Sequence, residues 1–399
     1  MNALSTNRSS TAEAHAAALA GLRAMTPVRL AMMLAEHDPV TAWHAIQIGI
    51  HPADPRRKFE AAARAVDVGA VAEHYRRAGV AIVLPGSPRY PSMLVGDPGA
   101  PAALFARGDP TVMEGRKRVA IVGTRSATPY GRQVASELGR DLAAAGVVVV
   151  SGLARGIDGA SHAGAVRADG PSVAPPVAVV GTGLDVVYPS SNRGLWEQVA
   201  SQGALLSESP LGTPPHRRVF PARNRIIAAL ADVVVVVESH HAGGSLYTAE
   251  AAARRGIPVC AVPGSVRSRA SEGTNGLLVD GCTPVRDAAD VLVAVSLARS
   301  GREAPAPTPC SARLVAARGR GRGGSGVTSG PLEVPIRTPT GAEMNGAERS
   351  VLAAVEDTPT SFETILLRTD LSIAAAAEAC DDLAAAGVLR SGAGWWSRR

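Results

Sequence analysis

Short apolar runs rich in valine recur through the middle of the chain and alternate with stretches of helical pattern. Each run has four to six residues and is followed by glycine, serine or proline. Continuous apolar runs of this length are typical of parallel strands buried on both faces. The alternation predicts an α/β fold over residues 81–300, with a Rossmann-like, doubly wound, mainly parallel sheet. The runs are Val119–Val122, Val147–Ser151, Val177–Val180, Val233–Glu238 and Ile257–Val262.

The segments on either side of this region have other patterns. Residues 1–80 hold two helical stretches rich in alanine and predict a small helical, SAM-like domain. Residues 301–340 are rich in proline, glycine and arginine and predict a disordered linker. Residues 341–399 predict three helices and a short hairpin, as in a winged-helix-like domain. Because this region has many acidic residues, it could contact a protein, pack against the rest of the chain or bind DNA, and all three roles stay open here.

Composition excludes several classes of protein. The chain has 399 residues, 46% of them hydrophobic, and a formal net charge of +6. No apolar run reaches the roughly 18 residues of a transmembrane helix, and the first 25 residues do not resemble a signal peptide, so we expect a cytoplasmic protein. The four cysteines form no CxxC pair, and the adjacent His240 and His241 lack a third ligand nearby. We therefore expect neither a metal nor a cofactor.

The first apolar run ends in a glycine turn that carries an arginine. Gly123, Thr124 and Arg125 precede a predicted helix, and a helix start with free N–H groups attracts anions. Arg125 is placed to clamp a phosphate at the strand-end crevice where such sheets bind ligands. The dinucleotide fingerprint GxGxxG is absent, which counts against a dehydrogenase.

An acid–base pair is a second possibility. His162 follows Asp158 by one helical turn, so the two share a face. Such a pair either transfers protons or holds a strand-to-helix turn by a hydrogen bond. Because no serine or cysteine nucleophile has a matching motif, we favour the structural role and predict no catalytic residue.

The densest basic segment surrounds an aromatic residue. Arg217, Arg218, Phe220, Arg223 and Asn224 combine charges for phosphates with a ring that can stack on a base. A capped helix with a solvated basic face would have the same pattern, and both interpretations stay open here.

Two later turns complete the candidate crevice. Gly243, Gly244 and Ser245 form another glycine-rich turn before a helix, and Asn275 precedes an apolar helical stretch. Several such loops could line one groove at the carboxyl ends of the strands.

Taken in order, these motifs resemble the DNA-processing protein A family (DprA, also called Smf). The resemblance covers residues 85–290 and includes Ile121–Arg125, Gly181–Asp185, Phe220–Ile227 and Gly273–Asn275. It implies a Rossmann-like protein that is not an enzyme and binds incoming single-stranded DNA. It also implies loading of the RecA recombinase in natural transformation or related recombination, cooperation with single-strand-binding protein, and a homodimer.

The resemblance assigns roles to single residues. It implies a phosphate contact for Arg125, strand contacts for Phe220, Arg223 and Asn224, and a glycine–serine loop at Gly243–Ser245. A basic residue usually begins that loop, and Ala242 stands there instead, so one phosphate contact should be missing. The alternative is a LOG-type nucleotide phosphoribohydrolase. Gly243, Gly244 and Glu250 have the required spacing, but Leu246 and Tyr247 replace the later glycine and threonine.

Overall fold

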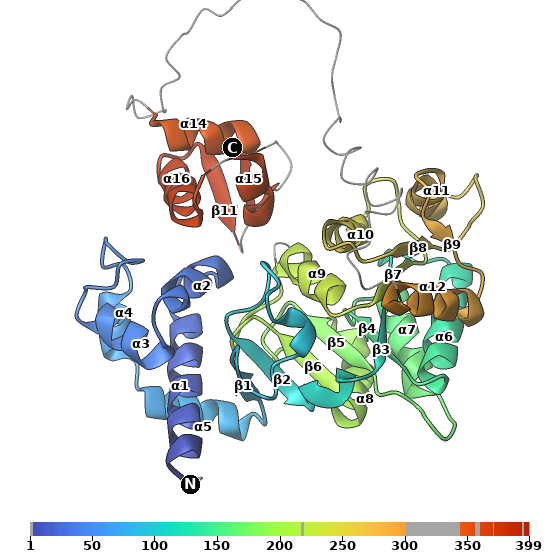
Figure 1. Cartoon of the computed structure of the whole chain (residues 1–399), viewed down its shortest axis with the longest axis horizontal. Coiled ribbons are helices and arrows are strands. Elements are labelled where there is room, and N and C mark those ends of the chain that lie inside the picture. Colours follow the sequence, from blue (N-terminus) through green and yellow to red (C-terminus); the bar gives the residue numbers. More distant parts are fainter. Residues whose placement is uncertain are drawn as a thin grey trace, which may run out of the picture.

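The computed structural model describes residues 3–216, 219–300, 344–355, 360–369, 371–392 and 395–398 (Figure 1). The predicted linker and the basic residues Arg217 and Arg218 lie outside these ranges. Within them, no helix is long and apolar enough to cross a membrane.

A mostly parallel sheet forms the centre of the protein, as the valine runs predicted. Nine strands of the described chain pair in the order β1-β2-β6-β5-β4-β3-β7-β8-β9. The contacts β1–β2 and β2–β6 are antiparallel, and the other neighbours are parallel. Their bounds are β1 Ala81–Val83, β2 Leu104–Gly108, β3 Lys117–Val122, β4 Val147–Ser151, β5 Val177–Val180, β6 Ala204–Ser207, β7 Val233–Val236, β8 Val259–Ala261 and β9 Thr283–Pro284.

Helices cover both faces of this sheet, which confirms the doubly wound architecture. One core cluster joins β3, β4 and β7 to α6 (Pro129–Ala144), α7 (Ile157–Val166) and α12 (Ala288–Ser300). Another joins the opposite side of the same strands to α9 (Val219–Ala229), α10 (Ser245–Arg254) and α11 (Glu272–Val279). Because both faces are buried, the strands carry valine in succession rather than at alternate positions.

Two glycines allow α6 and α7 to pack closely. A Cβ on Gly139 of α6 would collide with the Ser161 carbonyl oxygen, and one on Gly164 of α7 with the Ser136 carbonyl oxygen. The backbones therefore touch where any larger residue would separate them.

The N-terminal helices share a core with the sheet. They are α1 Ala3–Gly21, α2 Pro27–Ala35, α3 Pro39–Gln47, α4 Glu60–Ala65 and α5 Val68–Arg77. Their apolar residues form one cluster with β2, β5, β6 and α8 (Arg193–Gln202). The rings of Tyr75 and Phe105, 5.2 Å apart, join α5 to β2.

The C-terminal region has its own small core. It contains α14 (Gly346–Ala354), α15 (Phe362–Arg368) and α16 (Ile373–Ala385) around the buried Trp396 and Leu383. Strands β10 (Thr360–Ser361), β11 (Leu389–Gly392) and β12 (Trp395–Arg398) form a sheet in the order β10-β12-β11. Three helices and a final strand pair lie where the pattern predicted them, and the winged-helix assignment stays a prediction.

Candidate nucleic-acid interface

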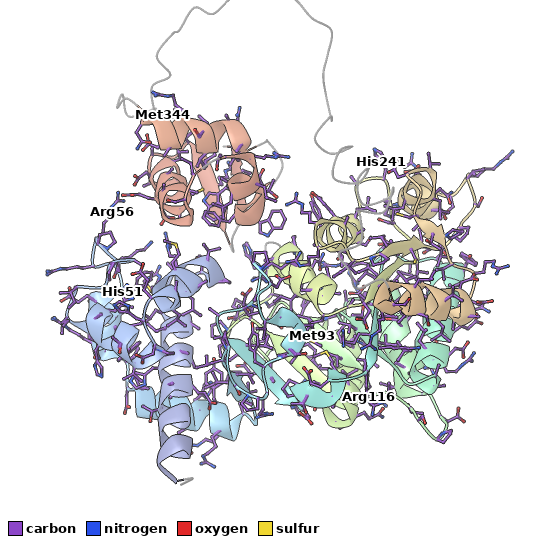
Figure 2. All side chains as sticks on the ribbon, viewed as in Figure 1. His51, Arg56, Met93, Arg116, His241 and Met344 are labelled. Carbon is purple, nitrogen blue, oxygen red and sulfur yellow. The ribbon has the colours of Figure 1, made fainter. Side chains whose placement is uncertain are left out.

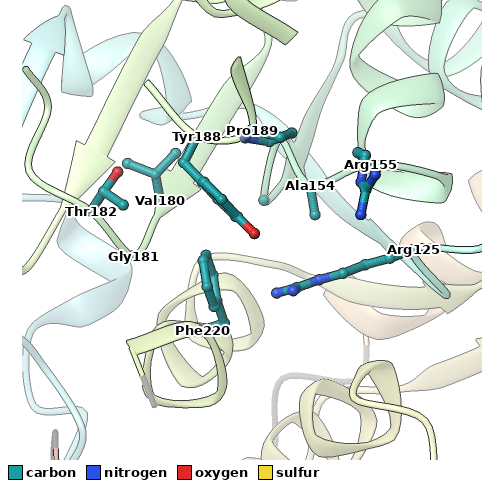
Figure 3. Close-up of a pocket in the computed structure, with 10 residues that line it drawn as sticks. Arg125, Ala154, Arg155, Val180, Gly181, Thr182, Tyr188, Pro189 and Phe220 are labelled. Carbon is teal, nitrogen blue, oxygen red and sulfur yellow. The ribbon is translucent and has the colours of Figure 1, made fainter. Parts of the chain in front are cut away.

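A small pocket lies at the carboxyl ends of β3, β4 and β5 (Figure 3). Parallel α/β sheets bind ligands at this edge because the loops after successive strands meet there. The loop after β3 contributes Arg125, the loop after β4 contributes Arg155, and the loop after β5 leads to Tyr188. Phe220, from the start of α9, closes the remaining side.

Two aromatic rings and one guanidinium converge in this pocket. The Arg125 guanidinium lies 4.4 Å from the centre of the Phe220 ring, and the Tyr188 ring centre lies 5.3 Å from it. In Figure 3 the side chains of Tyr188 and Arg125 both extend toward Phe220, Tyr188 from above and Arg125 from the right. The cavity volume is about 20 Å³, which is room for one water molecule. A base therefore has to stack on an outer face of this cluster or displace one of its members.

The structure corrects the assignment of Arg223. Its side chain is 6% exposed, and its guanidinium donates hydrogen bonds to the carbonyl oxygens of Gly152, at 2.8 Å, and Val179. The Asp158 carboxylate lies 3.9 Å away. A cation with this set of internal partners holds the ends of β4 and β5 together and does not face a strand of DNA.

Burial shifts the pKa of each charged group beneath the pocket. It lowers the pKa of Arg223 to about 10 and raises the pKa of Asp158, which Arg223 and Arg125 oppose. It also lowers the pKa of His162 to about 4. The His162 Nε2 pairs with the Val177 carbonyl oxygen at 3.1 Å, so this histidine anchors α7 to β5.

The helix start after β3 holds a carboxylate of the protein itself. Glu238, at the end of β7, accepts hydrogen bonds from the Thr128 N–H at 2.9 Å and the Thr128 hydroxyl at 2.5 Å. The Glu238 carbonyl accepts from the Thr124 N–H at 2.8 Å. A Cβ on Gly123 would collide with Ile157. The anion site predicted at this helix start is thus filled, and of the predicted turn only Arg125 is exposed.

The glycine–serine loop is joined to α9 by a hydrogen bond. The Asn224 Nδ2 donates to the Gly244 carbonyl at 3.2 Å and so ties α9 to the start of α10. Ser245 is buried and donates to the Ser239 hydroxyl at 2.9 Å. The N-cap residue of α10 is Gly244, which has no side chain that could cap the helix and is exposed. Gly243 packs against Ser239, because a Cβ would collide with that hydroxyl.

Asn275 has a structural role. Its Oδ1 accepts from the Gly264 N–H at 3.2 Å and its Nδ2 donates to the Gly264 carbonyl at 3.1 Å. Both sides of the carboxamide therefore hold the loop after β8, and a contact of Asn275 with DNA stays a prediction.

Two pocket residues escaped the sequence-based assignment. Arg155 and Tyr188 are both exposed, the latter by 37%, and both follow strand ends. An arginine after the second apolar run and a tyrosine after the third were available signals. What the sequence did not show is that these loops turn toward Arg125.

No group of three or more histidine, cysteine, aspartate or glutamate side chains that could hold a metal occurs among the described residues. Glu250, which the hydrolase alternative requires, pairs with Arg254 at 2.6 Å.

Comparisons with known proteins agree on one family. The family model of "DNA recombination-mediator protein A" matches residues 81–296. DNA processing protein DprA of Bacillus subtilis is 39% identical over 217 residues, which are 54% of this chain and 72% of the relative. Protein Smf of Synechocystis is 32% identical over 318 residues, 75% of each chain. The X-ray structure of DNA processing protein A from Streptococcus pneumoniae matches with a TM-score of 0.61 and 31% identity, covering 71% of this chain and 97% of that one.

Proposed function

Because this chain belongs to the DNA recombination-mediator protein A family, as its ordered motifs indicate, we propose that it binds single-stranded DNA during DNA processing. The observation that carries the proposal is the convergence of Arg125, Phe220 and Tyr188 at the strand ends. Arginine for phosphates beside aromatic rings for bases is the combination that single-strand binding uses. Such binding tolerates many sequences, because every base has a face that can stack.

The path of the strand follows from these groups. Arg125 and Arg155 lie on loops of neighbouring strands and are both exposed at the pocket, so we expect them to contact phosphates of the same strand. The start of α10 at the exposed Gly244 offers the positive end of the helix dipole to a further phosphate. The strand then runs along the carboxyl edge of the sheet, over Phe220 and toward α10.

The family relationship extends the proposal to partners. We propose that the protein acts in the cytoplasm as a homodimer that loads RecA onto the bound strand and cooperates with single-strand-binding protein. It acts by binding, since the histidine of the suspected acid–base pair is buried against a carbonyl. RecA loading is tested by the lag before RecA hydrolyses ATP on a coated oligonucleotide, which the protein should shorten.

Two exposed arginines that flank β3 provide a matched test of the interface. Arg125 follows the carboxyl end of β3, and Arg116 precedes its amino end. We expect Arg125→Ala to weaken binding of a labelled oligothymidine in fluorescence anisotropy, and the slope of log K against log salt to fall by about 0.7 per lost phosphate contact. Arg116→Ala removes the same charge at the opposite end of the strand and should change affinity little. Equal weakening by both variants would show that only net charge matters and would overturn the proposed interface.

A further inference from the structure

The C-terminal region touches two separate parts of the protein. Its helix α16 faces the N-terminal helices, where Asp381 pairs with Arg29 and the Asp382 carboxylate lies 2.6 Å from the Arg56 guanidinium. Val28 of α2 packs against the apolar core of the C-terminal region. Figure 1 shows this region between α2 and α10, and Figure 2 shows Arg56 directed toward it.

On its other side the same region contacts α10. The Trp395 ring lies edge-on to Tyr247, with 5.7 Å between the ring centres, and the Arg254 guanidinium donates to the Thr364 hydroxyl at 3.2 Å. Tyr247 belongs to the first turn of α10, three residues after Gly244. The contact therefore borders the glycine–serine loop at one end of the proposed DNA path.

The charge of this region is opposite to that of the remaining chain. Residues 341–399 contain nine acidic residues and five arginines, a formal charge of −4. Since the whole chain carries +6, residues 1–340 carry +10. An acidic body held beside the path lowers the positive potential that attracts a polyanion.

We propose that the acidic face of α16 is a docking surface whose partner is the surface of the N-terminal region that carries Arg29 and Arg56, in the same chain, and that docking opposes strand binding. The second half of this inference rests on the proposed function. A DNA strand that prefers the undocked form shifts the protein toward that form. By reciprocity, docking lowers the affinity for the strand by the same factor by which the strand disfavours docking. Measured affinity then equals the affinity of the undocked form multiplied by its population.

Two variants of opposite charge separate docking from simple electrostatics. The double variant Arg29→Glu with Arg56→Glu lowers the net charge by four, and Asp381→Arg with Asp382→Arg raises it by four. Both break the same two ion pairs. Combining all four substitutions restores opposite charges across the contact and the parent net charge.

The first measurement needs no DNA. Small-angle X-ray scattering of the full chain should give a larger radius of gyration for both double variants than for the parent, and the parent value for the fourfold variant. Hydrogen exchange of the first turn of α10, at Tyr247, should rise in both double variants and fall back in the fourfold one. Unchanged scattering and exchange in both double variants would refute the docked arrangement.

The second measurement is the affinity for a labelled oligothymidine. If docking opposes binding, both double variants bind about threefold to tenfold more tightly than the parent, even though one of them gained negative charge. If Arg29 and Arg56 contact the strand directly, or only net charge matters, the glutamate variant binds more weakly and the coupling is refuted. A parent that binds no strand at low salt refutes the proposed function, whereas the scattering comparison still decides docking.

Discussion

Replacing Arg223 by alanine should destabilise the protein rather than disturb a DNA contact. The substitution removes the buried cation that pairs with Asp158, whose side chain is 8% exposed, and removes the donors to the Gly152 and Val179 carbonyls. Removing one partner of a buried ion pair costs about 3–5 kcal/mol. For a region of 150–250 residues each kcal/mol lowers the melting temperature by roughly 2–4 °C, so we expect a decrease of about 6–20 °C.

Thermal and urea unfolding of Arg223→Ala, Arg125→Ala and the parent would measure this difference. Arg125→Ala is the matched control, because it removes the same side chain from an exposed position above the same pocket. It should melt close to the parent and lose affinity for the strand. Adding Asp158→Asn to Arg223→Ala should recover part of the stability, since it removes the uncompensated charge.

One result would refute this argument. If Arg223→Ala melts within about 2 °C of the parent and loses strand affinity as Arg125→Ala does, the Arg223 guanidinium faces the groove and its internal hydrogen bonds contribute little.

Four other substitutions test the fold around the site. Because burial lowers the pKa of His162 to about 4, from 6.5 in the unfolded chain, the unfolded state binds the extra proton between these values. The contribution of the neutral His162 to the free energy of unfolding is present above pH 6.5, and about 3 kcal/mol of it is lost as the pH falls to 4. The urea midpoint of His162→Gln should therefore depend less steeply on pH than that of the parent. Gly139→Val should cost about 1–3 kcal/mol because it forces α6 from α7, whereas Gly194→Ala, where a Cβ meets open space in α8, should stabilise by several tenths; chemical denaturation compares them. Glu238→Ala should cost about 1–3 kcal/mol by leaving the Thr128 donors unpaired, and hydrogen exchange should rise in the first turn of α6.

The sequence predicted the centre of the sheet better than its edge. Strands buried on both faces, such as β4 and β7, consist almost entirely of valine, a pattern typical of buried parallel strands. The antiparallel strands β1 and β2 are short and of mixed composition, so their runs do not stand out. Their pairing depends on contacts with β6, more than 90 residues further on, which no local pattern encodes.

In the basic segment, the local sequence does not show which side chains are buried and which are exposed. Phe220, Arg223 and Asn224 share one helical face by spacing, and the sequence therefore treated them alike. In the structure these three residues have different environments. Phe220 contacts Arg125 at the surface, and Asn224 bonds to the start of α10. Arg223 is buried between the ends of two strands. Which arginine is buried depends on the gap that Gly152 leaves, since a Cβ there would collide with the guanidinium.

Glu238 occupies the position at which a doubly wound sheet usually binds the phosphate of a nucleotide. The strand order reverses between β3 and β7, and doubly wound sheets usually bind their ligand at that point. Here a buried carboxylate from the end of β7 takes the N–H and hydroxyl groups at the start of α6 that a phosphate would otherwise use. A phosphate placed there would meet that negative charge, so anions are directed to the exposed Arg125 and Arg155, on the loops after β3 and β4. A long ligand that lies along the surface, such as a DNA strand, suits this arrangement better than a mononucleotide inserted between the strands.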